Sequence, residues 1–111
     1  MSWGHTVSKD LVTWEELPVA LLEEDGVMVF SGSAVVDQAN TSGFQVGDQV
    51  PYIAIYTGST SEEQNQNIAY SSDGGYTWTK YEGNPVLRIP GELNFRDPKV
   101  MWHYESEKWV M

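Results

Sequence analysis

The sequence contains no cysteine and only two histidines among its 111 residues. Without cysteine, the chain can form neither a disulfide framework nor a thiolate metal site. His5 and His103 lie far apart, without the close spacing that the histidine ligands of a metal usually have. We therefore expect no metal site and no cofactor.

Basic residues are scarce as well. Six Lys and Arg stand against sixteen Asp and Glu, which gives a formal net charge of −10 at pH 7. Nucleic acids and anionic membrane surfaces both bind clusters of Lys and Arg, so we expect neither as a partner. No apolar run approaches the length of a transmembrane helix, and residues 1–5 show no signal-peptide pattern.

Hydrophobic residues make up 41% of the chain, with five Trp and six Tyr, which is typical of a folded domain. Short β-prone stretches alternate with turn signals about every 8–12 residues, and this spacing predicts an all-β fold of about seven strands without a helix. The clearest expected strands are 27–37, 52–57, 67–71, 77–81, 95–103 and 108–111, with polar loops at 38–49 and 58–66.

The expected strands suggest a repeating unit. Four of them fall between residues 27 and 81, and four-stranded units of this length are typical of β-propeller blades. We expect residues 1–21 to end a first blade, residues 27–81 to form a second, and residues 95–111 to start a third. One blade with parts of its two neighbours cannot close a ring, so the chain is expected to be a piece of a larger fold.

The segment 94–100 is the strongest candidate for a binding site. Arg96 and Asp97 are adjacent opposite charges, and Pro98, which cannot donate to a β-ladder, is expected at the start or edge of a strand. A carboxylate at such a strand entrance, beside a guanidinium, is suited to accept hydrogen bonds from a polyhydroxylated ligand. The alternative is that both side chains satisfy local partners or form a structural ion pair.

Several stretches together match one family, and they occur in that family's order. They are residues 3–5 with 8–11, 14–21, 30–37, 68–71 and 95–100. The chain resembles glycoside hydrolase family 32, the β-fructosidases, which include invertases, inulinases and levanases. Arg96-Asp97-Pro98 alone is a weak signal, but downstream of Phe30-Ser31-Gly32-Ser33 and Trp3-Gly4-His5 it is specific, and the resemblance covers essentially the whole chain.

The resemblance implies a five-bladed β-propeller with a pocket on its axis, and a retaining mechanism that uses three acidic residues. The nucleophile belongs to an Asn-Asp-Pro motif and the acid/base to a Glu-Cys motif, and neither motif occurs here. The third acid, which stabilises the transition state, matches Asp97. The chain is therefore expected to be an internal part of the N-terminal catalytic domain of a glycosidase that cleaves β-fructofuranosidic bonds of sucrose or fructans (inulin, levan). On its own, it is expected to be inactive.

The same resemblance implies roles for three more residues and a location outside the cell. Phe30 is expected in the apolar wall of the pocket, Ser31 is expected to hydrogen-bond the sugar, and Arg96 is expected to balance charge and touch the pocket. Secretion is expected from the family alone. The alternative is a catalytically inert, truncated or lectin-like carbohydrate-binding fragment.

Other conspicuous residues have simpler explanations. Residues 71–78 match the Asp-box pattern, a structural hairpin turn, and with only Arg88 and Arg96 the arginine cluster of a sialidase is missing. We expect His5 to be a hydrogen-bonded structural residue and the acids at 62–63 and 105–107 to be solvated. A glycosylation sequon begins at Asn40. The five tryptophans are expected between blades: Trp3, Trp14, Trp78, Trp102 and Trp109.

Overall fold

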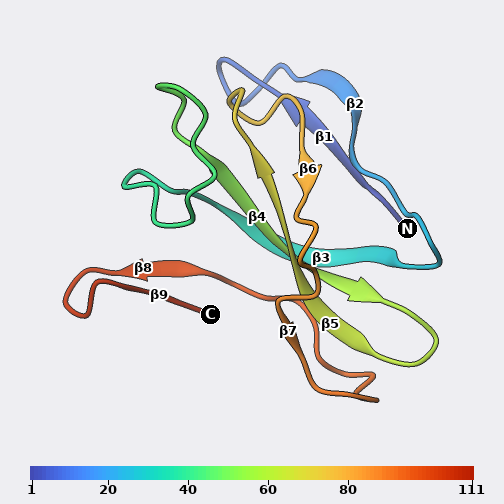
Figure 1. The fold of residues 1–111 in the computed structure, drawn as a ribbon. Coiled ribbons are helices and arrows are strands. Elements are labelled where there is room, and N and C mark those ends of the chain that lie inside the picture. The colour runs from blue at the N-terminus through green and yellow to red at the C-terminus, as the bar shows by residue number, and fades with distance from the viewer.

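The computed structural model describes all 111 residues, as nine strands without a helix, so the all-β prediction is confirmed (Figure 1). The chain contains no helix with the length and apolar character needed to cross a membrane. The strands are β1 (Trp3–Val7), β2 (Glu15–Leu21), β3 (Met28–Val36), β4 (Tyr52–Ser59), β5 (Gln64–Ser71), β6 (Thr79–Lys80), β7 (Leu87–Arg88), β8 (Met101–His103) and β9 (Lys108–Val110).

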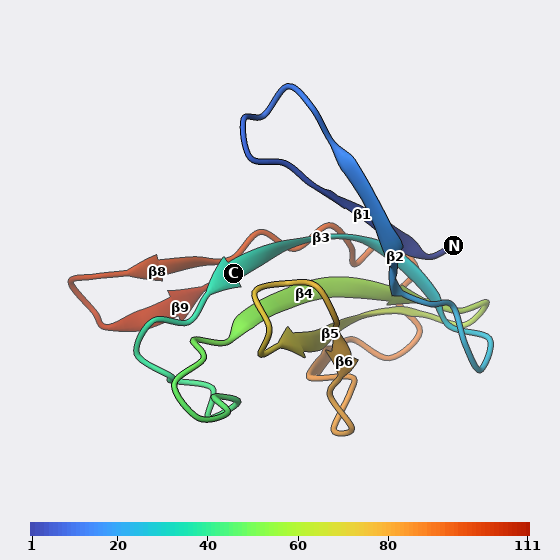
Figure 2. The same ribbon diagram turned by 90° about the horizontal axis from the view of Figure 1, so that it is seen from above.

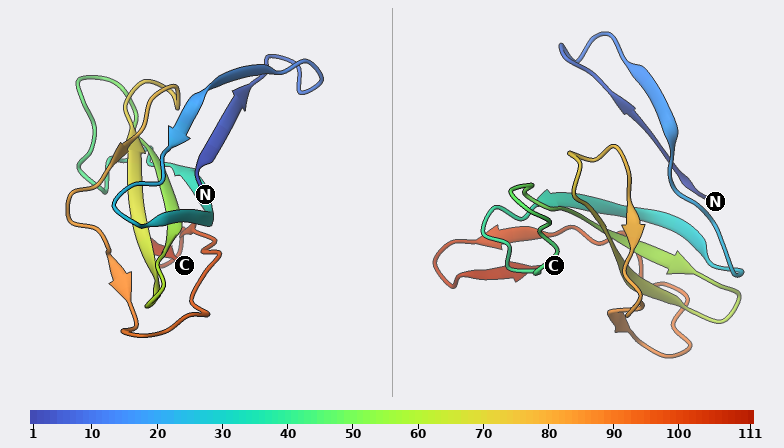
Figure 3. Two further views of the ribbon diagram at one scale, coloured as in Figure 1. Left: turned by 90° about the vertical axis from the view of Figure 1, so that its right-hand side faces the viewer. Right: turned by 45° about the horizontal axis from the view of Figure 1, so that its top comes forward.

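The strands form a central sheet and two hairpins, all with antiparallel pairing. The central sheet has the order β3-β4-β5-β6, with β7 also paired to β5. Strands β1 and β2 pair only with each other, and so do β8 and β9. Figure 2 shows the β1–β2 hairpin projecting from the central sheet, while β8–β9 lies beside the end of β3. The right-hand view of Figure 3 shows the central sheet between the two hairpins.

The two hairpins cover opposite faces of the central sheet, because successive side chains of a strand point to opposite sides. Ala54 and Tyr56 of β4 belong to one buried cluster, together with Leu21 at the end of β2. Ile53 and Ile55 belong to a second cluster on the other face, together with Val100 just before β8. The sheet between them is therefore buried on both sides.

Two sequence predictions about this sheet are wrong. The expected loop 58–66 shortens to 60–63, because β4 continues to Ser59 and β5 already begins at Gln64. The side chains of residues 64–66 are polar, which favoured a loop, yet all three are buried in the sheet and hydrogen-bonded. The expected strand 77–81 is also too long, since only Thr79 and Lys80 pair with β5.

The fourth position of the sheet is divided between β6 and β7, and Asn84 closes the gap. Its side-chain carbonyl accepts a hydrogen bond from Ile68 N, and its amide nitrogen donates to Ile68 O, both at 2.8 Å. Ile68 O also accepts from Tyr81 N, and Val86 N donates to Gln66 O, at 2.9 Å each. The side chain of Asn84 thus gives Ile68 N an acceptor in place of the backbone carbonyl that a regular strand would offer.

Other predicted positions need correction. Trp14 is 53% exposed, whereas Trp3, Trp78 and Trp109 pack against the buried clusters as expected. His5 is not hydrogen-bonded: both ring nitrogens are buried without a partner in the chain.

The expectation of solvated acids at 62–63 fails at Glu63, which accepts hydrogen bonds from Asn65 and from Arg88 at 2.8 Å each. This carboxylate therefore ties the start of β5 to β7, its neighbour in the sheet.

The turns at 8–14 and 71–78 have the same hydrogen-bond pattern. In each, the serine hydroxyl donates to the aspartate, at 3.0 Å to Asp10 and 2.7 Å to Asp73. The same carboxylate oxygen accepts from the amide of the following threonine, at 2.8 and 2.9 Å, and the closing tryptophan donates its indole N–H to a turn carbonyl. The β1–β2 turn is therefore a structural repeat of the Asp-box turn between β5 and β6.

The Asp73 turn should weaken in acid. Hydrogen bonds from the hydroxyl and the amide of Thr77 lower the pKa of Asp73 to about 2, below its ordinary value of 3.8. A lowered pKa adds stability that is complete above the ordinary value and is lost as the pH falls towards 2. We expect Asp73→Asn to lower the Tm of the protein near pH 6 and to lower it by roughly half as much near pH 3.

The matched control is Asp25→Asn, which changes an exposed aspartate whose carboxylate has no hydrogen bond in the chain. It should leave Tm unchanged at both pH values. A loss of Tm for Asp73→Asn that is equally large near pH 3 would contradict the role of the ionised carboxylate.

Candidate active site

The motif 30–33 contains a β-bulge. Strand β3 pairs Val29 with Gly58 and Gly32 with Tyr56, and the register shifts between these two pairs. Two residues of β3, Phe30 and Ser31, therefore lie opposite the single residue Thr57 of β4. Bulges of this kind twist a strand locally and redirect its side chains, and they are frequent next to active sites.

Gly32 lets β3 pass close to β4 just after the bulge. A Cβ atom at this position would lie 2.0 Å from Ile55 O and 2.7 Å from the Cα of Tyr56, both of which are backbone atoms that cannot turn aside. Any other residue at position 32 must push the two strands apart. The glycine thus fixes the conformation in which Phe30 and Ser31 leave the regular ladder.

The segment 95–100 crosses one face of the central sheet, and three strands each hold it with one polar side chain. From β5, Gln66 Nε2 donates to Phe95 O at 2.8 Å. From β4, Thr57 Oγ1 accepts from Asp97 N at 3.0 Å. From β3, Ser33 donates to Pro98 O at 2.9 Å and accepts from Val100 N at 3.1 Å. The expected strand therefore begins only at Met101, and Pro98 lies buried in the crossing segment.

Asp97 has a left-handed backbone and a free carboxylate. Its φ is +62°, a region that aspartate tolerates better than most residues but that still costs about 1 kcal/mol or more. Its side chain is exposed and has neither a hydrogen bond nor a salt bridge within the chain. The carboxylate is therefore available to a ligand.

Arg96 turns away from Asp97, so the two do not form the structural ion pair that the sequence left open. One guanidinium nitrogen, Nη1, donates to Gln64 Oε1 at 3.2 Å, to Asn94 Oδ1 at 3.1 Å and to Leu93 O at 3.3 Å. All three acceptors are neutral. The positive charge of Arg96 is therefore held in place by neighbours that do not neutralise it.

Thr57 connects the predicted site residues. The bulge with Phe30 and Ser31 lies opposite it, and the backbone of Asp97 is bonded to its hydroxyl, with Arg96 adjacent. None of the four predicted residues lines any of the five main cavities of the chain. The bulge and the backbone of Asp97 thus meet at Thr57, outside these cavities.

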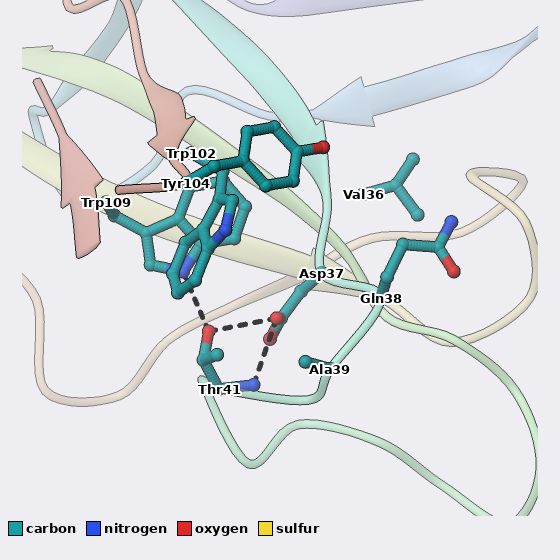
Figure 4. A pocket seen from close by; sticks show the side chains of 8 residues that line it. All are labelled: Val36, Asp37, Gln38, Ala39, Thr41, Trp102, Tyr104 and Trp109. Carbon is teal, nitrogen blue, oxygen red and sulfur yellow. Dashed lines mark hydrogen bonds between the residues drawn. The ribbon is translucent and has the colours of Figure 1, made fainter. Parts of the chain in front are cut away.

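A cavity of about 260 Å³ lies instead beyond the other end of β3, beside the β8–β9 hairpin (Figure 4). Its one carboxylate, Asp37, is buried, and it accepts four hydrogen bonds from Thr41 and Ser42 at 2.7–2.9 Å. Although burial raises the pKa of Asp37, these hydrogen bonds outweigh it and leave that pKa below its ordinary value. Trp109 donates to Thr41 Oγ1 at 2.7 Å. Asp37 thus holds the 37–42 turn together and is not a free catalytic acid.

Sequence reasoning missed Thr57 and Gln66. A signal was present, because both interrupt an apolar alternation: Thr57 follows Ile53 and Ile55 on one face of β4, and Gln66 precedes Ile68 in the same way on β5. Polar residues at core positions of paired strands indicate that something polar is bonded there.

A doubly buried antiparallel sheet with parts of neighbouring sheets on both faces is the arrangement of a β-propeller blade, and its free carboxylate next to a bulge suits a polar ligand. Comparison with known proteins defines the family. The model of the glycosyl hydrolases family 32 N-terminal domain matches residues 1–111, and the chain belongs to this family. The five-bladed propeller fold expected from the sequence is confirmed by its structural neighbours.

Two relatives and one solved structure illustrate the match. Levanase of Bacillus subtilis is 61% identical over 111 residues, which is all of this chain and 16% of the levanase. Invertase of Schizosaccharomyces pombe is 52% identical, over 98% of this chain and 20% of the invertase. The β-fructofuranosidase of Schwanniomyces occidentalis complexed with fructosyl-erythritol superposes with a TM-score of 0.89 at 49% identity, over 98% of this chain and 22% of that chain.

Relatives from Meyerozyma guilliermondii and Aspergillus awamori, 49% and 47% identical, are named extracellular exo-inulinases. They cover 98% and 100% of this chain, which spans 22% and 25% of their lengths. The chain thus spans no more than a quarter of the curated relatives described here.

Gly32→Ala should destabilise the protein, because the new methyl group meets backbone atoms of β4. Overpacking of this kind typically costs about 1–3 kcal/mol. We expect a lower Tm for this variant in a thermal melt of the protein. Gly4→Ala is the control, since a Cβ at position 4 has nothing within 4 Å. If both variants melted with the wild type, the close approach of β3 to β4 would be refuted.

Proposed function

We propose that the protein to which this chain belongs cleaves β-fructofuranosidic bonds of sucrose or of fructans such as inulin and levan. The observation that carries the proposal is the free carboxylate of Asp97, held in an Arg-Asp-Pro segment beside the Phe30–Ser31 bulge in a chain of this family. The names of its relatives, levanase, invertase and exo-inulinase, support this substrate class.

Asp97 acts in this proposal as the stabiliser of the transition state. A retaining glycosidase needs a nucleophile and an acid/base about 5–5.5 Å apart, and both would come from parts of the protein outside this chain. Asp97 would accept hydrogen bonds from fructose hydroxyls, and these strengthen as the sugar takes on oxocarbenium character. A carboxylate without a partner in the chain is free for this task.

The other predicted residues would shape the same site. Phe30 would contribute to the apolar wall and Ser31, exposed on the bulge, would hydrogen-bond the sugar. Arg96 would balance the charge of Asp97, since its own hydrogen bonds in the chain go only to neutral acceptors.

We also propose a placement within the larger protein. Residues 1–21 would end the first blade, residues 27–81 would form the second and residues 95–111 would start the third blade of the N-terminal catalytic propeller. The repeat of the 71–78 turn at 8–14 supports this, because it makes β1–β2 the counterpart of β5–β6. The relatives named as extracellular enzymes support secretion.

Asp97→Asn should abolish most of the activity of the protein with this chain in place. Hydrogen bonds that strengthen in the transition state are worth several kcal/mol, and each ~1.4 kcal/mol is tenfold in rate, so we expect kcat for sucrose to fall on the order of 10²–10³-fold. Fructose release is the measurement, with circular dichroism to check the fold.

The control for this test is Asp48→Asn, an exposed loop residue whose change should leave kcat intact. Wild-type kcat in the Asp97→Asn variant would refute the role of Asp97 and, with it, the proposed site.

The isolated 111-residue chain should release no fructose from sucrose or inulin, because it carries neither the Asn-Asp-Pro nor the Glu-Cys motif of the family. Fructose release by the purified chain, above that of the same chain with Asp97→Asn, would contradict this. Sugar binding without release would instead favour the lectin-like alternative for the chain alone.

A further inference from the structure

We propose that Thr57 and Gln66 are positioning residues for the reaction, which hold Asp97 in its working conformation from inside the sheet. The proposal rests on the function proposed above for Asp97 and extends it to two side chains that face away from solvent. Neither residue is expected to touch the substrate, because Thr57 is 0% and Gln66 2% exposed.

The two side chains form a one-way chain of hydrogen bonds to the crossing segment. Thr57 donates its hydroxyl hydrogen to Gln66 Oε1 at 3.1 Å, so its oxygen is left to accept from Asp97 N at 3.0 Å. Gln66, whose oxygen is thus occupied, donates with Nε2 to Phe95 O at 2.8 Å. The direction of each of these hydrogen bonds is therefore defined. Together they hold the backbone on both sides of Arg96, at Phe95 O and at Asp97 N.

The pair is rigid because of where it lies. Thr57 and Gln66 are direct partners in the register of β4 and β5, the two central strands of the sheet. Both are buried, and a buried polar group that loses its partner pays its full desolvation cost. The pair therefore resists rearrangement, and the position of Asp97 N relative to the sheet is fixed.

The left-handed backbone of Asp97 makes this support necessary. With φ at +62°, the residue is in a conformation that persists only where the surroundings enforce it. The hydrogen bond from Asp97 N to Thr57 is the only one that this residue makes within the chain. Without it, the backbone can relax and the carboxylate moves with it.

A shift of the carboxylate should affect kcat more than KM. The hydrogen bonds of Asp97 to the sugar are proposed to strengthen in the transition state, so a misplaced carboxylate loses them there first. A displacement of about 1 Å can cost on the order of 10²-fold in rate. A merely structural pair would instead lower stability and leave the kcat of the folded enzyme unchanged.

The test compares Thr57→Val and Thr57→Ser in the protein with this chain in place, with sucrose as substrate. Valine keeps the shape and removes the hydroxyl, whereas serine keeps the hydroxyl. We expect Thr57→Val to lower kcat by about 10–100-fold with KM within about threefold, and Thr57→Ser to retain kcat within about threefold. Gln66→Met, which keeps the side-chain length without its polar atoms, should lower kcat in the same way.

Ser71→Ala is the matched control for stability. Ser71 is 1% exposed and its hydroxyl holds the 71–78 turn, which has no hydrogen bond to the crossing segment. We expect this variant to lower Tm while kcat stays at the wild-type value. If Thr57→Val behaved like Ser71→Ala, with a lower Tm and an unchanged kcat, the positioning role would be overturned.

A double variant separates this proposal from the proposed function. If Thr57 acts through Asp97, then Thr57→Val should lower kcat no further once Asp97 is already Asn. A full additional loss in that background would overturn the proposal, because Thr57 would then act by another route. If Asp97→Asn lost most of its kcat while Thr57→Val kept the wild-type kcat, only the positioning role of Thr57 would be overturned. Wild-type kcat for Asp97→Asn would overturn both.

Discussion

The hydrogen bonds between the central sheet and the crossing segment 95–100 are the constraint on which the structure depends. A backbone that crosses a sheet at an angle cannot pair with its strands, and its buried polar groups need other partners. Gln66, Thr57 and Ser33 provide them, one from each of three neighbouring strands. Without the segment, the Ser33 hydroxyl and the amide nitrogen of Gln66 would lose their partners, and the Thr57 hydroxyl would lose the donor Asp97 N. The polar groups of the sheet and of the segment therefore supply each other's hydrogen-bond partners. This explains why polar residues occupy core positions of β3, β4 and β5.

Side chains replace backbone ladders wherever this chain leaves regular β geometry. Asn84 pairs with both polar groups of Ile68 at the break between β6 and β7. Asp10 and Asp73 hold the backbone amides of two similar turns, and Asp37 holds those of the turn after β3. Amide and carboxylate side chains suit this work because they accept or donate at several points with little entropy to lose. Short polar residues of this sequence thus also have a structural role, as the hydrogen-bond partners of the backbone.

Polar residues occur both in loops and buried in the sheet, and this limits how much of the structure the sequence could predict. The turns and apolar strands were predictable because their glycines, aspartates and β-branched residues have strong local preferences. Asp97 was found from its neighbours Arg96 and Pro98 and from a family motif, and neither revealed that it is tied to Thr57 from 40 positions away. Residues 64–66 were predicted as a loop, since polar burial depends on partners such as Phe95 that are remote in sequence. The predicted burial of Trp14 and the predicted hydrogen bond of His5 were wrong for the same reason, because both depend on tertiary contacts.

The crossing segment also joins the fold to the site. Ser33 bonds to Pro98 and Val100 on one side of Asp97 and Gln66 bonds to Phe95 on the other, while Val100 packs into the cluster with Ile53 and Ile55. The hydrogen bonds that fix the position of the Asp97 carboxylate relative to the sheet thus belong to the same interface that holds β8 and β9 against the central sheet. Packed interfaces of this kind do not deform gradually, because close-packed side chains have few alternative arrangements. An open, exposed carboxylate can therefore be held as firmly as a buried one, because its backbone, and not its side chain, is what the sheet fixes.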